Sequence, residues 1–269
     1  MPKPNTSASP APYRVLQFTD CHLYGDAAGQ LRGVATWPSL QATVEHALRE
    51  HGPWDATLLS GDLVQDDPAG YARIREMFGA SRSPVYCLPG NHDDPEAMTR
   101  ELHSPPFTIN GHARAGAWLM VLLDSYVAGS ARGHLSQDEL ERLDLALSDH
   151  PDSPALVCLH HHPIAMGSRW LDQVGLDNGA ALFAVLDRHP QVRAVVWGHV
   201  HQSYEGRRGN LRLLSTPATC AQFRPGSDGF AIDRRPPGYR WFDLHPDGRL
   251  ETGVEWVAPA ATALAANGV

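Results

Sequence analysis

The chain has 269 residues, 42% of them hydrophobic and 19% charged, with a formal net charge of -8. This composition is typical of a globular protein with a large buried core, and the acidic balance argues against a protein that coats nucleic acid, which needs a basic face. No apolar run approaches the roughly 20 residues of a membrane helix, and residues 1–12 lack the apolar segment of a secretory signal. The four cysteines are scattered without a C-x-x-C pair, which indicates reduced thiols. We therefore expect a cytoplasmic protein without a membrane partner.

The first half of the chain alternates predicted strands with predicted helices. Hydrophobic patterns predict strands at 13–19, 56–60 and 85–88, and amphipathic helices at 37–50, 68–78 and 95–102. The acidic pair Asp93 and Asp94 opens the third helix. Strands that alternate with helices in this way favour a mainly parallel sheet.

The second half continues the alternation and then changes character. Strands are predicted at 118–123, 155–159 and 193–197, and helices at 136–147 and 178–188. Ser136 and Glu139 match a capping box at the start of the first of these helices. Further on, turns around Gly209, Gly226 and Gly248 separate short strands, which predicts an antiparallel sheet near the C-terminus. We expect two stacked sheets in one domain over residues 13–257, with flexible termini at 1–12 and 258–269.

Polar clusters follow three of the strands in the first half. They are Asp20-Cys21-His22, Gly61-Asp62 and Gly90-Asn91-His92-Asp93. Residues two apart in an extended chain project to the same side, so Asp20 and His22 could share one metal ion. Taken alone, the first two clusters could equally be a polar strand end and a turn.

Two further clusters follow strands of the second half. They are His160-His161-His162-Pro163 and Gly198-His199-Val200-His201, and each alone could be a solvated corner or a surface pair. In α/β proteins the binding crevice lies at the carboxyl ends of the strands. We therefore expect all five clusters to meet on one rim of the sheet. The clusters contain seven of the 15 histidines, and histidine is the commonest metal ligand near neutral pH. The sequence therefore predicts a metal site.

In order and spacing, the five clusters resemble the signature of the calcineurin-like metallophosphoesterase superfamily: D-x-H, G-D, G-N-H-[DE], H-x-P and G-H-x-H. The resemblance runs from Asp20 to His201. It implies an α/β fold, a four-layer αββα sandwich of two mixed β-sheets flanked by helices, with two divalent or transition metal ions. The implied ligands are Asp20, His22 and His201 for one ion, Asn91, His161 and His199 for the other, and Asp62 as the bridge.

The same resemblance assigns the remaining residues of the clusters. The H-x-P register selects His161 and leaves His160 and His162 as neighbours, while Cys21 is expected to point away from the metals. It also implies that His92 lies at the scissile phosphate as the catalytic residue, and we expect Asp93 to orient it.

The predicted ligands suit phosphodiester hydrolysis. Nitrogen and oxygen ligands without thiolate suit transition metals, and we expect iron or manganese, with cobalt or zinc as alternatives. Because two such ions lower the pKa of bound water toward about 7, a metal-bridging hydroxide is the expected nucleophile. Only Asp20 and Asp62 are anionic among the predicted ligands, so the loaded site stays positive and attracts a phosphodiester.

A narrower resemblance, to bacterial class III 3′,5′-cyclic AMP phosphodiesterases, lies in segments 168–173, 215–223, 237–240 and 247–248. It implies hydrolysis of cyclic AMP to 5′-AMP, with the small-molecule cyclic nucleotide as partner. We expect a monomer or homodimer and, from the negative charge, no nucleic-acid partner. The phosphate is then expected near His22, Asp62, Asn91, His92 and His201. Two alternatives stay open: a general phosphodiesterase for glycerophosphodiesters or 2′,3′-cyclic nucleotides, and a metal-free binding scaffold. Trp170 and Phe223 could stack on the base or simply pack.

Overall fold

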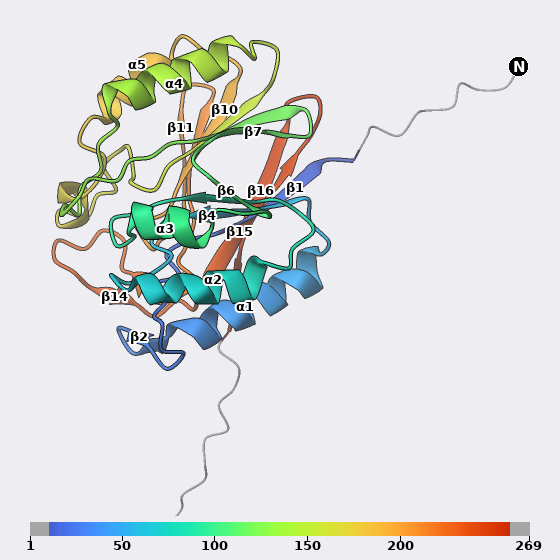
Figure 1. Ribbon diagram of the computed structural model, residues 1–269. Helices are drawn as coiled ribbons and strands as arrows, with labels where there is room; N and C mark the ends of the chain where they lie inside the picture. The colour runs from blue at the N-terminus through green and yellow to red at the C-terminus, as the bar shows by residue number, and fades with distance from the viewer. Residues whose placement is uncertain (1–10, 259–269) are drawn as a thin grey trace, which may run out of the picture.

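Two six-stranded sheets lie face to face at the centre of the computed structural model, which describes residues 11–258 (Figure 1). The first sheet has the order β16-β15-β1-β4-β5-β6. Its strands are β1 (Tyr13–Phe18), β4 (Ala56–Ser60), β5 (Val85–Leu88), β6 (Phe107–Ile109), β15 (Gly238–Leu244) and β16 (Leu250–Trp256). Strands β1, β4, β5 and β6 run parallel, whereas β15 is antiparallel to both of its neighbours.

The second sheet has the order β11-β12-β10-β9-β8-β7. Its strands are β7 (Gly111–Ala115), β8 (Trp118–Leu122), β9 (Ala155–Cys158), β10 (Val192–Trp197), β11 (Tyr204–Arg208) and β12 (Leu211–Ser215). The four inner strands are parallel and the two edge strands antiparallel. The predicted short antiparallel strands near the C-terminus are present as the pairs β11–β12 and β15–β16. They do not form one sheet, because β11 and β12 extend the second sheet while β15 and β16 extend the first. Two short ribbons complete the strands, β2 (Gln30–Leu31) with β3 (Val34–Ala35) and β13 (Gln222–Phe223) with β14 (Ile232–Asp233).

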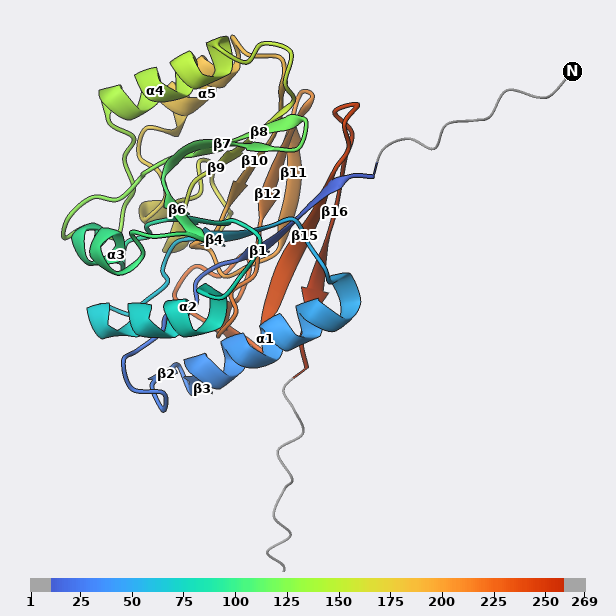
Figure 2. The same ribbon diagram turned by 45° about the vertical axis from the view of Figure 1, so that its right-hand side comes forward.

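Helices cover both outer faces of the stacked sheets (Figures 1 and 2). Against the first sheet lie α1 (Thr36–His51), α2 (Tyr71–Phe78), which follows the 3-10 turn η1 (Pro68–Gly70), and α3 (Pro95–Glu101). Against the second lie α4 (Gln137–Ser148) and α5 (Gly179–Leu186), and the 3-10 turn η2 (Leu171–Gln173) stands near the strand ends. The predicted four-layer αββα sandwich is confirmed. Among the described residues, no helix combines the length and the apolarity needed to cross a membrane.

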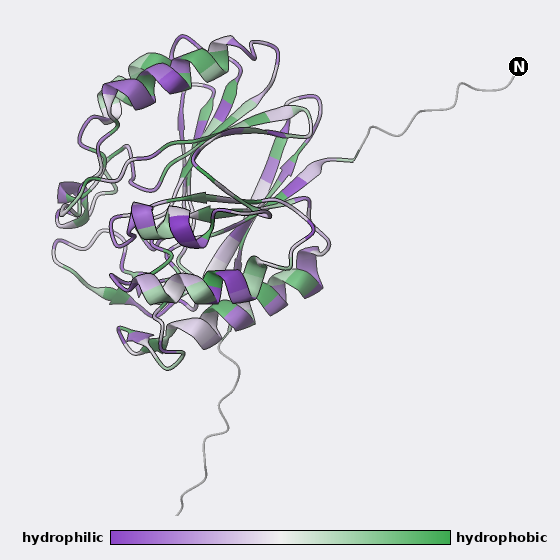
Figure 3. Ribbon diagram, in the orientation of Figure 1, coloured by the Kyte–Doolittle hydropathy of each residue, from purple (hydrophilic) through white to green (hydrophobic). Residues whose placement is uncertain are grey.

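The twofold alternation of strand side chains divides the core into layers. In β1, Leu16 and Phe18 pack toward the helices, whereas Val15 packs between the sheets. In β9, Val157 packs toward α4 and α5, whereas Leu156 packs between the sheets. Each fully buried side chain of this kind contributes about 1.5–3 kcal/mol. Figure 3 shows largely hydrophobic inner strands beside helices that mix hydrophobic and hydrophilic residues.

The predicted capping box is half present. Ser136 Oγ accepts a hydrogen bond of 3.1 Å from Glu139 N at the start of α4, as expected of an N-cap. The Glu139 carboxylate does not return to Ser136, because it accepts from Asp124 N and pairs with Arg142 instead. The single-domain boundaries 13–257 stay a prediction, and the predicted flexible termini fall almost entirely outside the described residues.

Candidate metal centre

The five polar clusters come from both sheets. Those after β1, β4 and β5 leave the first sheet, and those after β9 and β10 leave the second. The expectation of a single sheet rim is therefore wrong, and the site lies where the carboxyl ends of two sheets meet. Backbone bonds join the clusters: Asp20 N donates to Gly61 O at 3.0 Å, and Gly198 N donates to His160 O at 3.2 Å.

Most of the predicted ligands sit on left-handed backbone. The structure describes eight non-glycine residues with positive φ, and five of them are predicted ligands. They are Asp20 (φ 52°), His22 (47°), Asp62 (50°), His199 (66°) and His201 (47°). The extended D-x-H backbone expected from the sequence is thus wrong, because β1 ends at Phe18. Such conformations cost of order 1–3 kcal/mol each and persist where the surroundings impose them.

Asp20, His22 and His201 nevertheless converge. His201 Nε2 lies 3.1 Å from His22 Nε2 and 3.3 Å from Asp20 Oδ1, and all three side chains are buried. The other ring nitrogen of His201 contacts Ala221 O at 2.6 Å, which fixes the ring as second partners fix metal-binding imidazoles. Cys21, as expected, belongs to the core under the helices.

Cys220 was missed by the sequence prediction. Its thiol lies within 4.8 Å of one ring nitrogen each of His22 and His201, and it donates to Asp20 O at 3.1 Å. No spacing in the sequence signals this contact, because the loop after β12 brings Cys220 back beside the first cluster.

A second group gathers around His161 and His199, whose ring centroids are 4.8 Å apart. His161 Nδ1 contacts Ser125 Oγ at 2.8 Å, while its Nε2 has no hydrogen-bond partner. His199 Nε2 and Asn91 Oδ1 are also buried without a partner. Burying unpaired polar atoms costs free energy, so unpaired nitrogens on the neighbouring rings of His161 and His199 fit a bound cation, and Asn91 lines the same cavity as His199. The residues present thus fit the implied metal centre.

The three histidines of the triplet make different contacts. His160 Nδ1 contacts Ser60 O at 2.8 Å, and its Nε2 lies 3.3 Å from Asp62 Oδ2 in a close ionic contact rather than an aligned hydrogen bond. His161 keeps an unpaired nitrogen for the second group, and His162 stacks on His199 at 5.5 Å between centroids. His160 Nε2 and both ring nitrogens of His162 are also buried without a hydrogen-bond partner, so the choice of His161 as the ligand rests on the H-x-P register and stays a prediction.

Asp62 lies between the two groups. Its Oδ2 is 3.7 Å from His22 Nε2, and its Oδ1 accepts from His92 N at 2.9 Å. Gly90 makes room for this carboxylate, because a Cβ there would stand 2.3 Å from Asp62 Oδ1. A carboxylate in this position can contact ions on either side.

Burial and neighbouring charges set the protonation of these groups. Burial lowers the pKa of His22 to about 4 and holds the pKa of His161 and His199 well below the usual range. Burial alone would raise the pKa of Asp62, but neighbouring positive charge, mainly that of His160, more than offsets it and holds that pKa well below its usual value. Neutral imidazoles and an ionised carboxylate are the forms that bind metal.

His92 stands at the edge of the site, with its ring centroid 5.2 Å from that of His22. Its Nδ1 lies 3.0 Å from Asp66 Oδ2 and 2.9 Å from Gln65 Nε2, and Gln65 Nε2 also donates to Asp66 at 2.8 Å. The Asp66 carboxylate suits a protonated Nδ1 and the Gln65 amide suits an unprotonated one, and either way the contacts engage Nδ1 and not Nε2. Neither residue was singled out from the sequence, since both lie beyond the short G-D motif.

The expectation that Asp93 orients His92 is wrong. The Asp93 carboxylate is buried and accepts from Gly90 N at 2.8 Å, from Leu63 N at 3.1 Å and from the Tyr71 hydroxyl at 2.9 Å. Burial and the nearby Asp62 raise the pKa of Asp93 to about 7. Asp93 thus shapes the loops under the site instead of touching the His92 ring.

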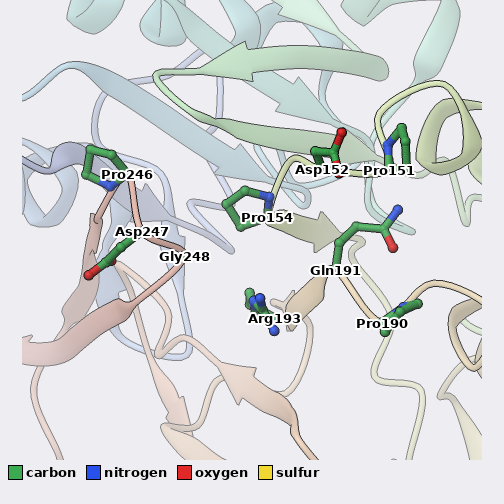
Figure 4. A pocket seen from close by; sticks show the side chains of 9 residues that line it. All are labelled: Pro151, Asp152, Pro154, Pro190, Gln191, Arg193, Pro246, Asp247 and Gly248. Carbon is green, nitrogen blue, oxygen red and sulfur yellow. The ribbon is translucent and has the colours of Figure 1, made fainter.

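A cavity of about 230 Å³ opens above these residues. Its walls combine polar residues of the clusters with three aromatic side chains and an arginine. They include His22, Asp62, Asn91, His92, His199, His201, Trp170, Phe223, Phe230 and Arg32. A different hollow, of about 440 Å³, lies at the opposite ends of β9 and β10 beside Pro154 and Arg193, and no predicted ligand lines it (Figure 4).

Relatives with curated functions match nearly the whole chain. The 3′,5′-cyclic adenosine monophosphate phosphodiesterase CpdA of Pseudomonas aeruginosa is 41% identical over 254 residues, covering 94% of this chain and 93% of the relative. The 3′,5′-cyclic-nucleotide phosphodiesterase alr5338 of Nostoc is 36% identical over 247 residues, covering 91% of this chain and 93% of the relative.

Solved structures support the fold. A dimetal phosphatase from Danio rerio superposes with a TM-score of 0.62 at 15% identity, over 93% of this chain and all of that one. Purple acid phosphatase PPD1 from yellow lupin superposes with a TM-score of 0.59 at 14% identity, over 93% of this chain and 55% of that one. The calcineurin-like phosphoesterase family matches residues 13–203. The chain therefore belongs to the calcineurin-like phosphoesterase family, which uses a dinuclear metal centre.

Proposed function

We propose that the protein is a metal-dependent phosphodiesterase that hydrolyses 3′,5′-cyclic AMP to 5′-AMP. One observation carries the chemistry: ligand atoms of Asn91, His161 and His199 are buried without hydrogen-bond partners, and Asp20, His22 and His201 converge beside Asp62. The substrate is supported by the relatives, of which several are named cyclic AMP or cyclic nucleotide phosphodiesterases.

The proposed ligands divide between two ions. Asp20, His22 and His201 would hold one ion, Asn91, His161 and His199 the other, and Asp62 both. Iron or manganese suits this mixture of nitrogen and oxygen donors, and cobalt or zinc are the alternatives. When bound, two such ions supply positive charge for the phosphate and lower the pKa of water.

The chain's own residues then complete the site. His22, Asp62, Asn91, His92 and His201 would surround the phosphate, since all five line the same cavity. Because Asp66 engages Nδ1 of His92, Nε2 is the nitrogen left for substrate. We assign to the doubly protonated ring the donation of its Nε2 proton to the departing 3′ oxygen, which leaves a neutral ring with Nδ1–H held by Asp66. The burial of Asp20 and Asp62 removes competing water from the charged groups.

The wider setting of the enzyme is also part of the proposal. We propose a cytoplasmic monomer or homodimer without a nucleic-acid partner. Its four cysteines are buried free thiols, as expected in a reducing compartment. The negative net charge of -8 disfavours nucleic acid as a partner.

Side-by-side product analysis tests this function. Purified protein loaded with Mn²⁺ or Fe²⁺ is offered 3′,5′-cyclic AMP, 3′,5′-cyclic GMP, 2′,3′-cyclic AMP and bis-p-nitrophenyl phosphate. We expect 5′-AMP as the product of the first. Ready cleavage of the aryl ester with intact cyclic AMP would sink the cyclic nucleotide assignment in favour of a general phosphodiesterase. A protein that binds no transition metal and cleaves none of the esters would be a binding scaffold.

A further inference from the structure

Three aromatic side chains from distant segments meet on one wall of the catalytic cavity. Trp170 stands at the start of η2, Phe223 lies in β13, and Phe230 lies in the loop between β13 and β14. The Trp170 ring centroid is 5.4 Å from that of Phe223 and 5.2 Å from that of Phe230, and the two phenylalanines are 5.3 Å apart. We call these three residues the aromatic cluster.

The cluster is held against the metal-binding residues. Phe223 stacks on the His201 ring with 3.9 Å between centroids and 10° between planes, and its backbone N donates to His201 O at 3.2 Å. Ser227 N donates to Ser168 Oγ at 3.1 Å, which ties the Phe230 loop to the segment that carries Trp170. The cluster is thus built at a fixed position beside the predicted phosphate site.

Packing alone does not explain Phe230. Its side chain is 46% exposed and belongs to none of the hydrophobic clusters of the described residues, whereas Trp170 packs partly against the second-sheet core. The Arg32 guanidinium covers the Phe230 ring at 4.7 Å from the centroid, and both residues line the catalytic cavity. An aromatic surface that stays partly exposed inside a cavity, with a cation over one ring, is typical of a binding site for a flat ligand.

We propose that the aromatic cluster binds the base of the nucleotide by stacking, with Arg32, which lies over the Phe230 ring, as a further wall of the base site. The inference rests on the proposed function, because it places the base next to the phosphate that the metal residues would hold. Stacking uses the face of the ring, which every base has, and its strength grows with ring area. The site should therefore favour purine over pyrimidine cyclic nucleotides, and ring-free phosphodiesters gain nothing from it.

The test separates binding of the base from binding of the phosphate. The substrates are cyclic AMP, cyclic CMP and the base-free cyclic ribose 3′,5′-phosphate. The variants are Phe230→Ala and Trp170→Leu, the latter preserving apolar packing, and the matched control is Leu145→Ala, which removes an exposed leucine from α4. Metal content is measured for every protein.

We expect wild type and Leu145→Ala to show a much lower KM for cyclic AMP than for the base-free compound. In Phe230→Ala and in Trp170→Leu that ratio of KM values should shrink by about tenfold, since stacking on one aromatic contributes about 1–3 kcal/mol. A ratio that stays at the wild-type value in both variants overturns the proposal, and so does a wild-type preference for cyclic CMP.

A binding measurement keeps the proposal testable if the enzyme acts on another ester. Titration calorimetry of metal-loaded protein compares 5′-AMP with ribose 5-phosphate. If wild type cleaves no cyclic nucleotide, the proposed function fails, yet a tighter binding of 5′-AMP that is lost in Phe230→Ala still supports the stacking. Equal affinity of wild type for both compounds overturns the stacking whether or not cyclic AMP is hydrolysed.

Discussion

The contact between His92 and Asp66 can be weakened by the nearly isosteric change Asp66→Asn. In the native protein Asp66 Oδ2 lies 3.0 Å from His92 Nδ1, and the two side chains are 67% and 34% exposed. Solvent screens a pair as open as this, so its contribution is about 0.2–1 kcal/mol. We therefore expect the kcat for cyclic AMP to fall at most about fivefold.

The assay uses the leaving group to test whether the loss concerns proton donation. Cyclic AMP must release an alkoxide, which needs a proton, whereas p-nitrophenolate leaves without one. The Asp66→Asn change should lower kcat for cyclic AMP and leave kcat for bis-p-nitrophenyl phosphate nearly unchanged. Asp138→Asn, which changes an exposed carboxylate on α4, is the matched control.

Two results would refute the argument. An equal loss on both esters would mean that Asp66 supports the whole site and not the proton donor. If Asp93→Asn also lowered kcat for cyclic AMP but not for bis-p-nitrophenyl phosphate, the buried Asp93 carboxylate would orient His92 after all. From its bonds to Gly90, Leu63 and Tyr71 we expect Asp93→Asn to lower Tm instead.

Three further predictions concern the roles of His92 and Asp62, the space at Gly90 and the buried Arg240. His92→Ala should keep its metals and lose about 10²–10⁴-fold in kcat, whereas Asp62→Ala should lose both, as metal analysis and kinetics will show. Gly90→Ala should lose metal, because the new Cβ would stand 2.3 Å from Asp62 Oδ1. Arg240→Met should lower Tm by about 3–12 °C in calorimetry, since losing the buried bond to Ser215 O, which joins the two sheets, costs about 1.5–3 kcal/mol. The pair with the 51% exposed Glu205 side chain adds little.

Each of these has its own control. Equal metal loss in His92→Ala and Asp62→Ala would contradict the separation of their roles. Gly229→Ala places its Cβ in open space and should keep its metals. Arg249→Met removes an exposed arginine and should leave Tm within a degree or two; a similar shift in both arginine variants would show that burial of Arg240 is not the cause.

Local chemistry made much of the fold predictable from the sequence. The strand predicted at 56–60 is β4 with the same bounds, because a short apolar run ends at Gly61, whose φ of 92° suits glycine. The predicted ligands could be located for the same reason, since each cluster directly follows such a run. Strand ends and the clusters that follow them are set by residues adjacent in the chain, so one sequence is enough to locate them.

Pairing between distant segments was not predictable in this way. Strand β15 pairs with β1 across more than two hundred residues, and nothing local in 238–244 says which sheet it joins. The left-handed backbone at His22 and the approach of Asp66 to His92 likewise depend on loops that meet only after folding. Asp93 seemed the natural partner of His92 because it is adjacent in sequence, but its side chain turns into the core.

The packing of the two sheets against each other explains how the site maintains backbone and side-chain features that cost free energy. Left-handed residues and unpaired buried atoms destabilise the chain locally, so the surroundings must hold them in place. Asp62 follows β4 and His160 follows β9, and the side chains that set the spacing of these strands are the interlayer ones, such as Leu58 and Leu156. Shrinking an interlayer side chain would let the sheets shift and would move Asp62 relative to His161. Shrinking a helix-facing one such as Leu16 costs similar burial but leaves that spacing alone. The interlayer core therefore governs the geometry of the metal centre, and the outer layers govern mainly stability.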